Sequence, residues 1–320
     1  MKDIDIVRLQ PSQAESVLAC FRKVYGDSYA NETFYDVDAL RFAMTEERIR
    51  CVGAISGGSV IAHMAMTVHD TSAVYPELGN TVVSPAARGE GLAWRVGSAL
   101  TDWCLELGFT GYLHYPTTAH PIMQQQSVKA GFETGLMLGY IPGETDGQVY
   151  GSPSQLREAA TVVFEPLSDN QKELAVYLPQ KHAADISAFA EQCGLPRIWL
   201  EGGSVTVAEE SSMALHRFRK RGLTRLQVKV AGSDFRSNLL DLVDEPAPCL
   251  QLDLNMDDPA INLAVDLAVE FGFVFSAWLP GVNESDVFRL QRVDSSQTVM
   301  LPGVVNPVAT SLLTAITEQL

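Results

Sequence analysis

Hydrophobic positions in the first part of the chain change between strand-like and helix-like spacing. A strand is predicted over 4–9, and a hairpin over 52–68, where apolar runs flank Ser56-Gly57-Gly58. From Leu92 apolar residues recur every three or four positions as far as Leu107, which is the period of an amphipathic helix, and Gly108 follows where a helix commonly ends. A strand over 110–115, a helix over 121–130 and a strand opening at Gly131-Phe132 come next. The pattern predicts an α/β fold.

A weaker version of this pattern occupies the rest of the chain. It predicts strands over 173–178, 226–230 and 249–254, helices over 182–193 and 259–271, and a strand pair opening at Gly272-Phe273. The basic cluster 216–221 is interpreted as the cationic last turn of a helix that begins near Ser211 and is closed by Gly222. Polar residues near 167–171 mark a boundary. We therefore expect two domains, 1–167 and 168–320.

Composition supports a soluble protein of two cores. The chain has 320 residues, of which 46% are hydrophobic, and no apolar run reaches the roughly 18 residues of a membrane span. The first residues, Met1-Lys2-Asp3, show no signal-peptide core. Five widely separated cysteines favour reduced, buried thiols. These features predict a cytoplasmic location and no membrane association.

The net charge and the spacing of His and Cys argue against two further classes of function. The net charge is −16 and is spread evenly over both halves, so nucleic acid is an unexpected partner. The chain has no His-x-x-x-His or Cys-x-x-Cys pattern, and no metal is expected.

The connection between Thr81-Val82-Val83 and the helix at Leu92 carries the strongest chemical signal. Gly89 and Gly91 allow the backbone to approach an anion, and the first N–H groups of a helix carry partial positive charge. A pyrophosphate would suit such a loop, although similar loops also join strands to helices with no ligand. A dinucleotide fingerprint is excluded because Trp94 stands where its third glycine would be, and neither a P-loop nor a nucleophile elbow is present.

The remaining pattern, Arg88-x-x-Gly91-x-Ala93, resembles the acetyl-coenzyme A loop of the GNAT N-acetyltransferases, which reads Arg/Gln-x-x-Gly-x-Gly/Ala. The order of the following elements is also similar, and the resemblance covers about 1–165. It implies a central mixed, mostly antiparallel sheet flanked by helices, with acetyl-coenzyme A as cosubstrate. The implied cofactor-binding residues are Val82, Val83, Arg88, Gly89, Glu90, Gly91, Leu92 and Ala93. The second half lacks the motif and is interpreted as a degenerate GNAT-like domain that binds no cofactor.

The resemblance also implies catalytic roles. Glu77 stands eleven positions before Arg88, where many family members place the general base, and a backbone N–H near Val83 would stabilise the oxyanion. Ser127 occupies the position of the tyrosine that often protonates the leaving thiolate, and His120 is an alternative to it. The acceptor pocket is expected at the aromatic residues after the first helix, which are Tyr25, Tyr29 and Tyr35.

The sequence thus predicts an acetyl-coenzyme A-dependent N-acetyltransferase in which an amine attacks directly. The acceptor would be a small-molecule or peptide amine. The alternative is a non-catalytic acyl-coenzyme A sensor that regulates a partner, which the missing tyrosine favours. We expect the second domain to cover the acceptor side of the first or to form the face of a homodimer.

Overall fold

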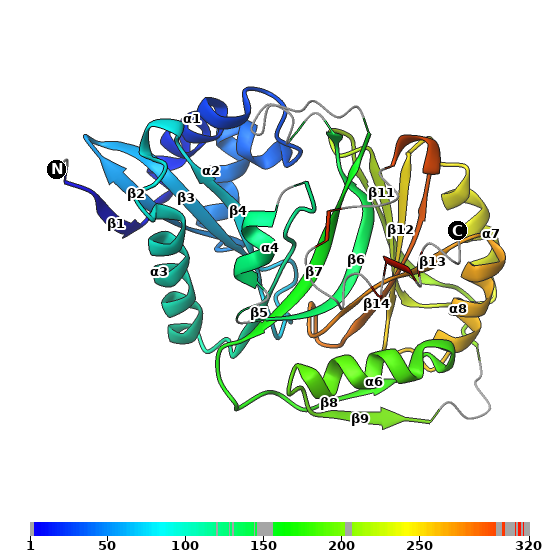
Figure 1. The fold of residues 1–320 in the computed structure, drawn as a ribbon. Helices are drawn as coiled ribbons and strands as arrows, with labels where there is room; N and C mark the ends of the chain where they lie inside the picture. The colour runs from blue at the N-terminus through cyan, green and yellow to red at the C-terminus, as the bar shows by residue number, and fades with distance from the viewer. Residues whose placement is uncertain are drawn as a thin grey trace.

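The computed structural model describes residues 3–119, 121–127, 129, 131–143, 145, 156–201, 207–298, 303–304, 311, 313–314 and 316. Within these ranges a single twelve-stranded sheet has the order β1-β2-β3-β4-β5-β7-β6-β13-β14-β12-β11-β10, and β8 and β9 form a separate pair. The large sheet runs through the molecule with helices on its faces (Figure 1). The predicted mixed, mostly antiparallel α/β class is confirmed, but the strands of the two halves are joined in one sheet.

Among the described residues, the first half contributes seven strands and four α-helices. These are β1 (Asp5–Arg8), α1 (Ala14–Tyr25), α2 (Val37–Thr45), β2 (Ile49–Ser56), β3 (Ser59–Thr67), β4 (Glu77–Val83), α3 (Leu92–Glu106), β5 (Gly111–His114), α4 (Pro121–Ser127), β6 (Phe132–Ile141) and β7 (Glu158–Pro166). Helices α1 and α2 form one core against the sheet and α3 forms another. Leu92, Val96 and Leu100 of α3 are buried at the predicted spacing. The predicted hairpin is β2 and β3.

The second half contributes β8 (Leu174–Tyr177), α6 (Ala183–Gln192), β9 (Arg197–Leu200), β10 (Ser212–Phe218), β11 (Leu223–Val230), α7 (Phe235–Val243), β12 (Cys249–Asn255), α8 (Ile261–Glu270), β13 (Val274–Leu279) and β14 (Val287–Val293). Apolar side chains of α6, α7 and α8 join those of the strands in one core. At the right of Figure 1, α7 and α8 cover the outer side of β11 and β12. The opposite face of β11 and β12 is not covered by α7 and α8.

The prediction of a helix that begins near Ser211 is wrong. Residues 212–218 form β10, which pairs antiparallel with β11, and Gly222 takes a φ of 57° in the turn between them. Every residue of β10 is exposed because this strand is the sheet edge. The cationic residues of 216–221 are therefore on a hairpin, whose ladder of backbone hydrogen bonds decides the local structure over the charge pattern.

The strand order of the first half recurs in the second. Strands β3-β4-β5-β7-β6 correspond in order to β10-β11-β12-β14-β13. In each set one parallel pair, β4 with β5 or β11 with β12, is connected through a helix, α3 or α7. The expected boundary at 167–168 falls in the connection between β7 and β8.

The halves meet where β6 pairs antiparallel with β13, at Gly135 and Ala277. A Cβ on Gly135 would lie 2.3 Å from that of Ala277, so only glycine permits this approach. The buried amide of Gln291 accepts from the Leu138 N–H at 2.9 Å and donates to the Leu136 carbonyl at 3.3 Å. A side chain thus satisfies backbone groups at the junction.

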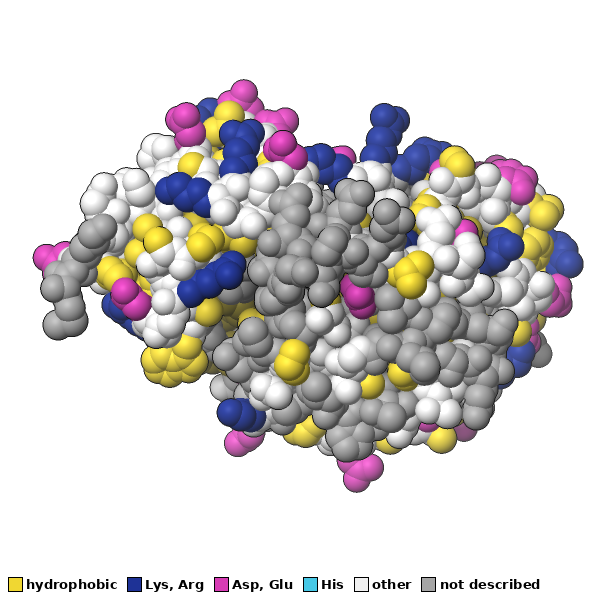
Figure 2. Space-filling model, turned by 45° about the horizontal axis from the view of Figure 1, so that its top comes forward, with side chains coloured by type: hydrophobic (Ala, Val, Ile, Leu, Met, Phe, Trp, Pro, Cys, Tyr) yellow, Lys and Arg dark blue, Asp and Glu magenta, His cyan; other side chains and the backbone are white. Residues whose placement is uncertain are grey.

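Charge is mixed over the surface. On the face in Figure 2, Lys and Arg side chains lie among Asp and Glu side chains. Among the described residues, no helix is long and apolar enough to cross a membrane. In the same ranges, no group of three or more His, Cys, Asp and Glu side chains could hold a metal ion. All five cysteines are free and buried.

Candidate active site

The loop before α3 has an uncapped helix start. Gly89 and Gly91 have φ values of 84° and 68°, and Gly91 is the N-cap of α3 in the left-handed conformation. No side chain caps this helix, and its first turn has no acidic residue. Among the residues that the structure describes, the first N–H groups of α3 therefore have no capping side chain, which is the arrangement that favours an anionic ligand.

Strands β4 and β5 pair only at one point, where Glu77 faces Leu113. Further along, β4 contains a bulge, and Asn80 has a φ of 53°. The side-chain oxygen of Asn80 accepts hydrogen bonds from the Tyr29 hydroxyl at 2.9 Å and from the Asn31 amide at 3.1 Å. These bonds fix the bulge, and β4 continues from it towards the loop without β5 beside it.

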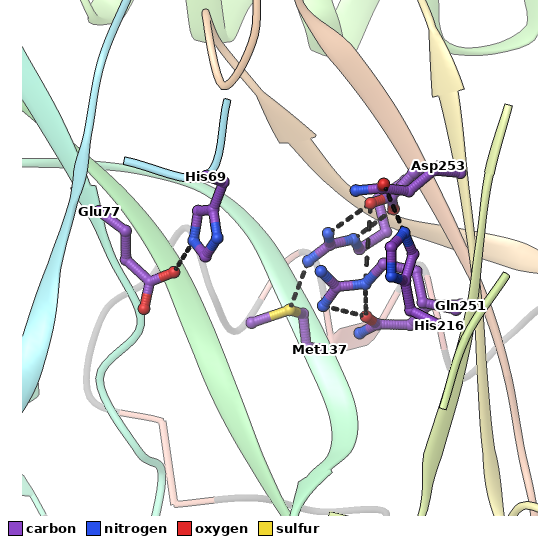
Figure 3. A network of polar contacts seen from close by, with 9 residues as sticks. His69, Glu77, Met137, His216, Gln251 and Asp253 are labelled. Carbon is purple, nitrogen blue, oxygen red and sulfur yellow. Dashed lines mark hydrogen bonds and ion pairs between the residues drawn. The ribbon is translucent and has the colours of Figure 1, made fainter. Parts of the chain in front are cut away.

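A cavity of about 870 Å³ lies between the two halves of the chain. The first half supplies Glu77 and the loop 30–33, and the second half supplies side chains from β10, β11, β12 and β14. In Figure 3, Glu77 and His69 lie on one side and Asp253, Gln251 and His216 on the other. The second half therefore closes the side of the first on which Glu77 lies.

Glu77 is a largely buried carboxylate with a histidine partner. Its side chain is 20% exposed, and its Oε2 accepts a hydrogen bond from Nε2 of His69 at 2.7 Å. Burial alone would raise the pKa of Glu77, but the His69 hydrogen bond and the charges of Arg221 and Arg225 lower it below its usual value. The carboxylate is thus ionised at neutral pH.

The opposite wall is formed by a charged network. Arg289 donates from Nε and Nη2 to the two carboxylate oxygens of Asp253, at 2.6 and 2.7 Å. Arg225 donates from Nε and Nη2 to the side-chain oxygen of Gln251, at 3.0 and 2.8 Å. Burial would raise the pKa of Asp253, but Arg289 and Arg225 hold it below its ordinary value. The Asp253 carboxylate is therefore already engaged by the protein.

The structure describes the surroundings of one of the two predicted proton donors, Ser127. Ser127 is buried in α4, and its hydroxyl donates to the Met123 carbonyl at 2.9 Å, so its proton is already used. His120 lies outside the described residues. His114 is buried at the end of β5, where burial lowers its pKa to about 4. Tyr115, the next residue, lines the cavity, and burial raises its pKa.

The three predicted acceptor-pocket tyrosines pack behind the cavity wall. The rings of Tyr25 and Tyr29 pack against Phe21, and the Tyr35 hydroxyl oxygen accepts a hydrogen bond from the Tyr29 N–H at 2.9 Å. The residues of this segment that line the cavity are 30–33, and none of the three tyrosines is among the lining residues. Their role in an acceptor pocket stays a prediction.

Sequence reasoning missed the second-half residues of the cavity. Arg225, Gln227 and Lys229 alternate with apolar residues along β11, and this period of two was the signal that they share one face. Arg289 on β14 had no comparable signal, because it lies in a strand buried along most of its length.

In the second half, as far as the structure describes it, the counterpart of the glycine loop is covered. The segment 208–211 covers the start of α7: the Ala208 carbonyl accepts from the Ser233 N–H, and Ser211 donates from both N–H and hydroxyl to Asp234. A Cβ on Gly232 would lie 2.4 Å from the Glu210 backbone. The chain itself thus fills the place that an anion would need.

Part of the first half is similar to a known protein family. Residues 14–123 match the model of the acetyltransferase (GNAT) family. No curated protein matches the chain.

Solved structures similar to this chain include three acetyltransferases. An N-acetyltransferase from Staphylococcus aureus Mu50 is 15% identical, with 52% of this chain and 99% of that chain covered and a TM-score of 0.41. The ribosomal-protein-S18-alanine N-acetyltransferase from Escherichia coli is 17% identical, with 52% and 95% covered and a TM-score of 0.41. A phosphinothricin acetyltransferase from Sinorhizobium meliloti, in complex with AcCoA, is 20% identical, with 52% and 89% covered and a TM-score of 0.41.

Proposed function

We propose that this chain is an N-acetyltransferase that uses acetyl-coenzyme A and a soluble amine. The observation that carries the proposal is the continuity of three features along β4: Glu77 in the cavity, the opening from β5, and the uncapped start of α3. The match of 14–123 to the acetyltransferase family model supports it. In the proposal, residues from Val82 to Ala93 hold the cosubstrate, with its phosphates on the N–H groups of 89–93.

When bound, acetyl-coenzyme A supplies the acetyl group as a thioester. Glu77 accepts the proton that the amine must lose before it attacks, either directly or through one water. The Val83 N–H donates to the oxygen on which negative charge develops. The charges of Arg221 and Arg225, which lower the pKa of Glu77, also lower the pKa of an ammonium bound beside it. The weak basicity of Glu77 is thereby matched by a more acidic substrate.

The direct test is release of free coenzyme A from acetyl-coenzyme A with a panel of amines and short peptides. Release that depends on the amine, with the acetylated amine detected by mass, is expected. Binding of acetyl-coenzyme A without release for any acceptor class would overturn the catalytic proposal and indicate a sensor.

The His69 hydrogen bond gives a pH prediction. The base works only when Glu77 is deprotonated, and its pKa is lowered, so activity is retained down to the acid range and falls as pH drops through that pKa. His69→Phe removes the hydrogen bond, so the effect of burial, which raises the pKa of Glu77, is less opposed. The acid limb of kcat/KM against pH should then move to higher pH. His216→Phe, on the far side of the cavity, is the control and should leave the limb in place. An unmoved limb in His69→Phe would contradict the assignment.

We further propose that the second half is a degenerate copy of the first that binds no cofactor. The repeated strand order supports the copy, and the covered start of α7 supports the loss of binding. Calorimetric titration of the full chain should therefore give one coenzyme A per chain. Two equivalent sites would show that the 208–211 segment does not block the second half.

A further inference from the structure

Two arginines in the cavity lack a carboxylate of their own. Asp253 is occupied by Arg289 through both oxygens, and Arg225 Nε lies 3.7 Å from its nearer oxygen. In the part of the chain that the structure describes, Nη1 of Arg225 has no hydrogen-bond acceptor. Arg221 forms no ion pair with any described residue and instead lies over the Tyr140 ring, 4.2 Å from its centroid. Both guanidinium groups line the cavity.

The positive charge there is not fully compensated. Burial, and then the positive charge of Arg289, lower the pKa of Arg225, although an arginine remains protonated in proteins. The lowered pKa of Arg225 means that its positive charge is unfavourable at this position. A nearby anion would make it less so. The Arg225 side chain is only 15% exposed, so water screens this charge weakly.

Counting the charged groups of the lining indicates the charge of the anion that this cavity would accept. Three guanidinium groups, of Arg221, Arg225 and Arg289, line the interior with two carboxylates, of Glu77 and Asp253. The difference is one positive charge. Four other charged residues of the lining are exposed to solvent, where their charges are screened: Glu32, Asp70, Lys229 and Glu284. With the amine in its neutral, attacking form, a ligand that carries one carboxylate would balance the interior, whereas a dianionic group would exceed it.

This site also contains the proposed base. Glu77, Arg221 and Arg225 all line this one cavity, so a ligand within it can face the guanidinium groups and the carboxylate together. The charges of both arginines also lower the pKa of Glu77. Resting on the proposed function, we infer that the acceptor is an amine that also carries a carboxylate, such as an amino acid or the end of a peptide. The carboxylate binds Arg225 and Arg221, and the amine faces Glu77.

Matched acceptors test this inference in the coenzyme A release assay. Each pair is an amino acid and the amine without its carboxylate, such as tyrosine and tyramine, or 4-aminobutyrate and propylamine, with phosphoethanolamine as a probe whose phosphate group is dianionic. We expect kcat/KM to be higher for the carboxylate member of at least one pair by about tenfold or more, as charge-assisted hydrogen bonds imply. Arg225→Gln should remove this preference. Lys229→Gln, on the same strand, is the matched control, because Lys229 is exposed and paired with Glu284, and it should retain the preference.

Equal rates within every pair, or a preference for phosphoethanolamine, would overturn the inference. So would a preference that persists in Arg225→Gln. Should that variant fail to fold by circular dichroism, Arg221→Gln carries the same test, because its side chain belongs to a turn and forms no ion pair with the described residues.

A binding arm separates this inference from the proposed function. N-acetylated amino acids and their uncharged amides are titrated against the full chain without acetyl-coenzyme A. Tighter binding of a carboxylate than of its amide, lost in Arg225→Gln, is expected even if no amine supports turnover, in which case only the proposed function fails. Equal binding of acids and amides, or no binding by any member of either set, would overturn the inference while leaving acetyl transfer to the release assay.

Discussion

Glu77→Gln should lower the rate of acetyl transfer at pH 7 by about 10² or more, because the amide keeps the size of the side chain but cannot accept a proton. Binding of acetyl-coenzyme A should be unchanged, since Glu77 lies at the start of β4 and the glycine loop follows its end. The measurement is coenzyme A release under saturating cosubstrate, with affinity determined by calorimetry. The loss should show in kcat as well as in kcat/KM.

A matched control distinguishes the loss of the proposed base from the loss of one negative charge in the cavity lining. Glu284→Gln removes one carboxylate from the same lining, but at an exposed position paired with Lys229. Its rate should stay close to that of the unmodified chain. If Glu77→Gln retained full activity across the pH range, or if both variants lost activity equally, Glu77 would not be the base.

Gly91→Glu should weaken binding of coenzyme A by about 10² or more, because a carboxylate would stand at the helix start where the phosphates are proposed to lie, and like charges in contact cost several kcal/mol. The glutamate Cβ would meet no atom within 4 Å, so the fold has room for it. The measurement is calorimetric titration with coenzyme A.

Backbone strain is controlled separately, because Gly91 has a φ of 68°. Gly91→Asn places an uncharged residue that tolerates the left-handed region at the same position. It should lose much less affinity than Gly91→Glu. Equal losses in the two variants would assign the effect to the backbone and remove the argument for phosphates at this loop, as would unchanged affinity in both.

Local patterns predicted the elements that bury one face. Helix α3 was predicted because Leu92, Val96 and Leu100 must all face one core, and β2 with β3 because apolar runs flank a glycine turn. Strand β10 was misinterpreted because an edge strand exposed along its length has no buried face to impose an alternation. A run of cationic residues then suggested a helix end.

The second wall of the cavity was not predictable for a different reason. The pairing of β6 with β13 joins residues 135 and 277, and nothing near either residue specifies such a distant partner. The motif position of Ser127 likewise could not reveal that its hydroxyl is bound to the preceding helical turn. The sequence predicts Glu77 as the base, but its His69 contact depends on the turn between β3 and β4 and had no local signal.

The shared junction also determines how a ligand can enter. Since Gly135 and Ala277 belong to neighbouring strands of one sheet, the walls of the cavity cannot swing apart as two lobes about a hinge without breaking that sheet. A second contact joins the same two halves, where the Val74 and Tyr75 N–H groups donate to the Gly281 carbonyl at 2.8 and 3.0 Å. The width of the cavity is thus preset by the sheet, and a ligand must enter while the two walls stay joined.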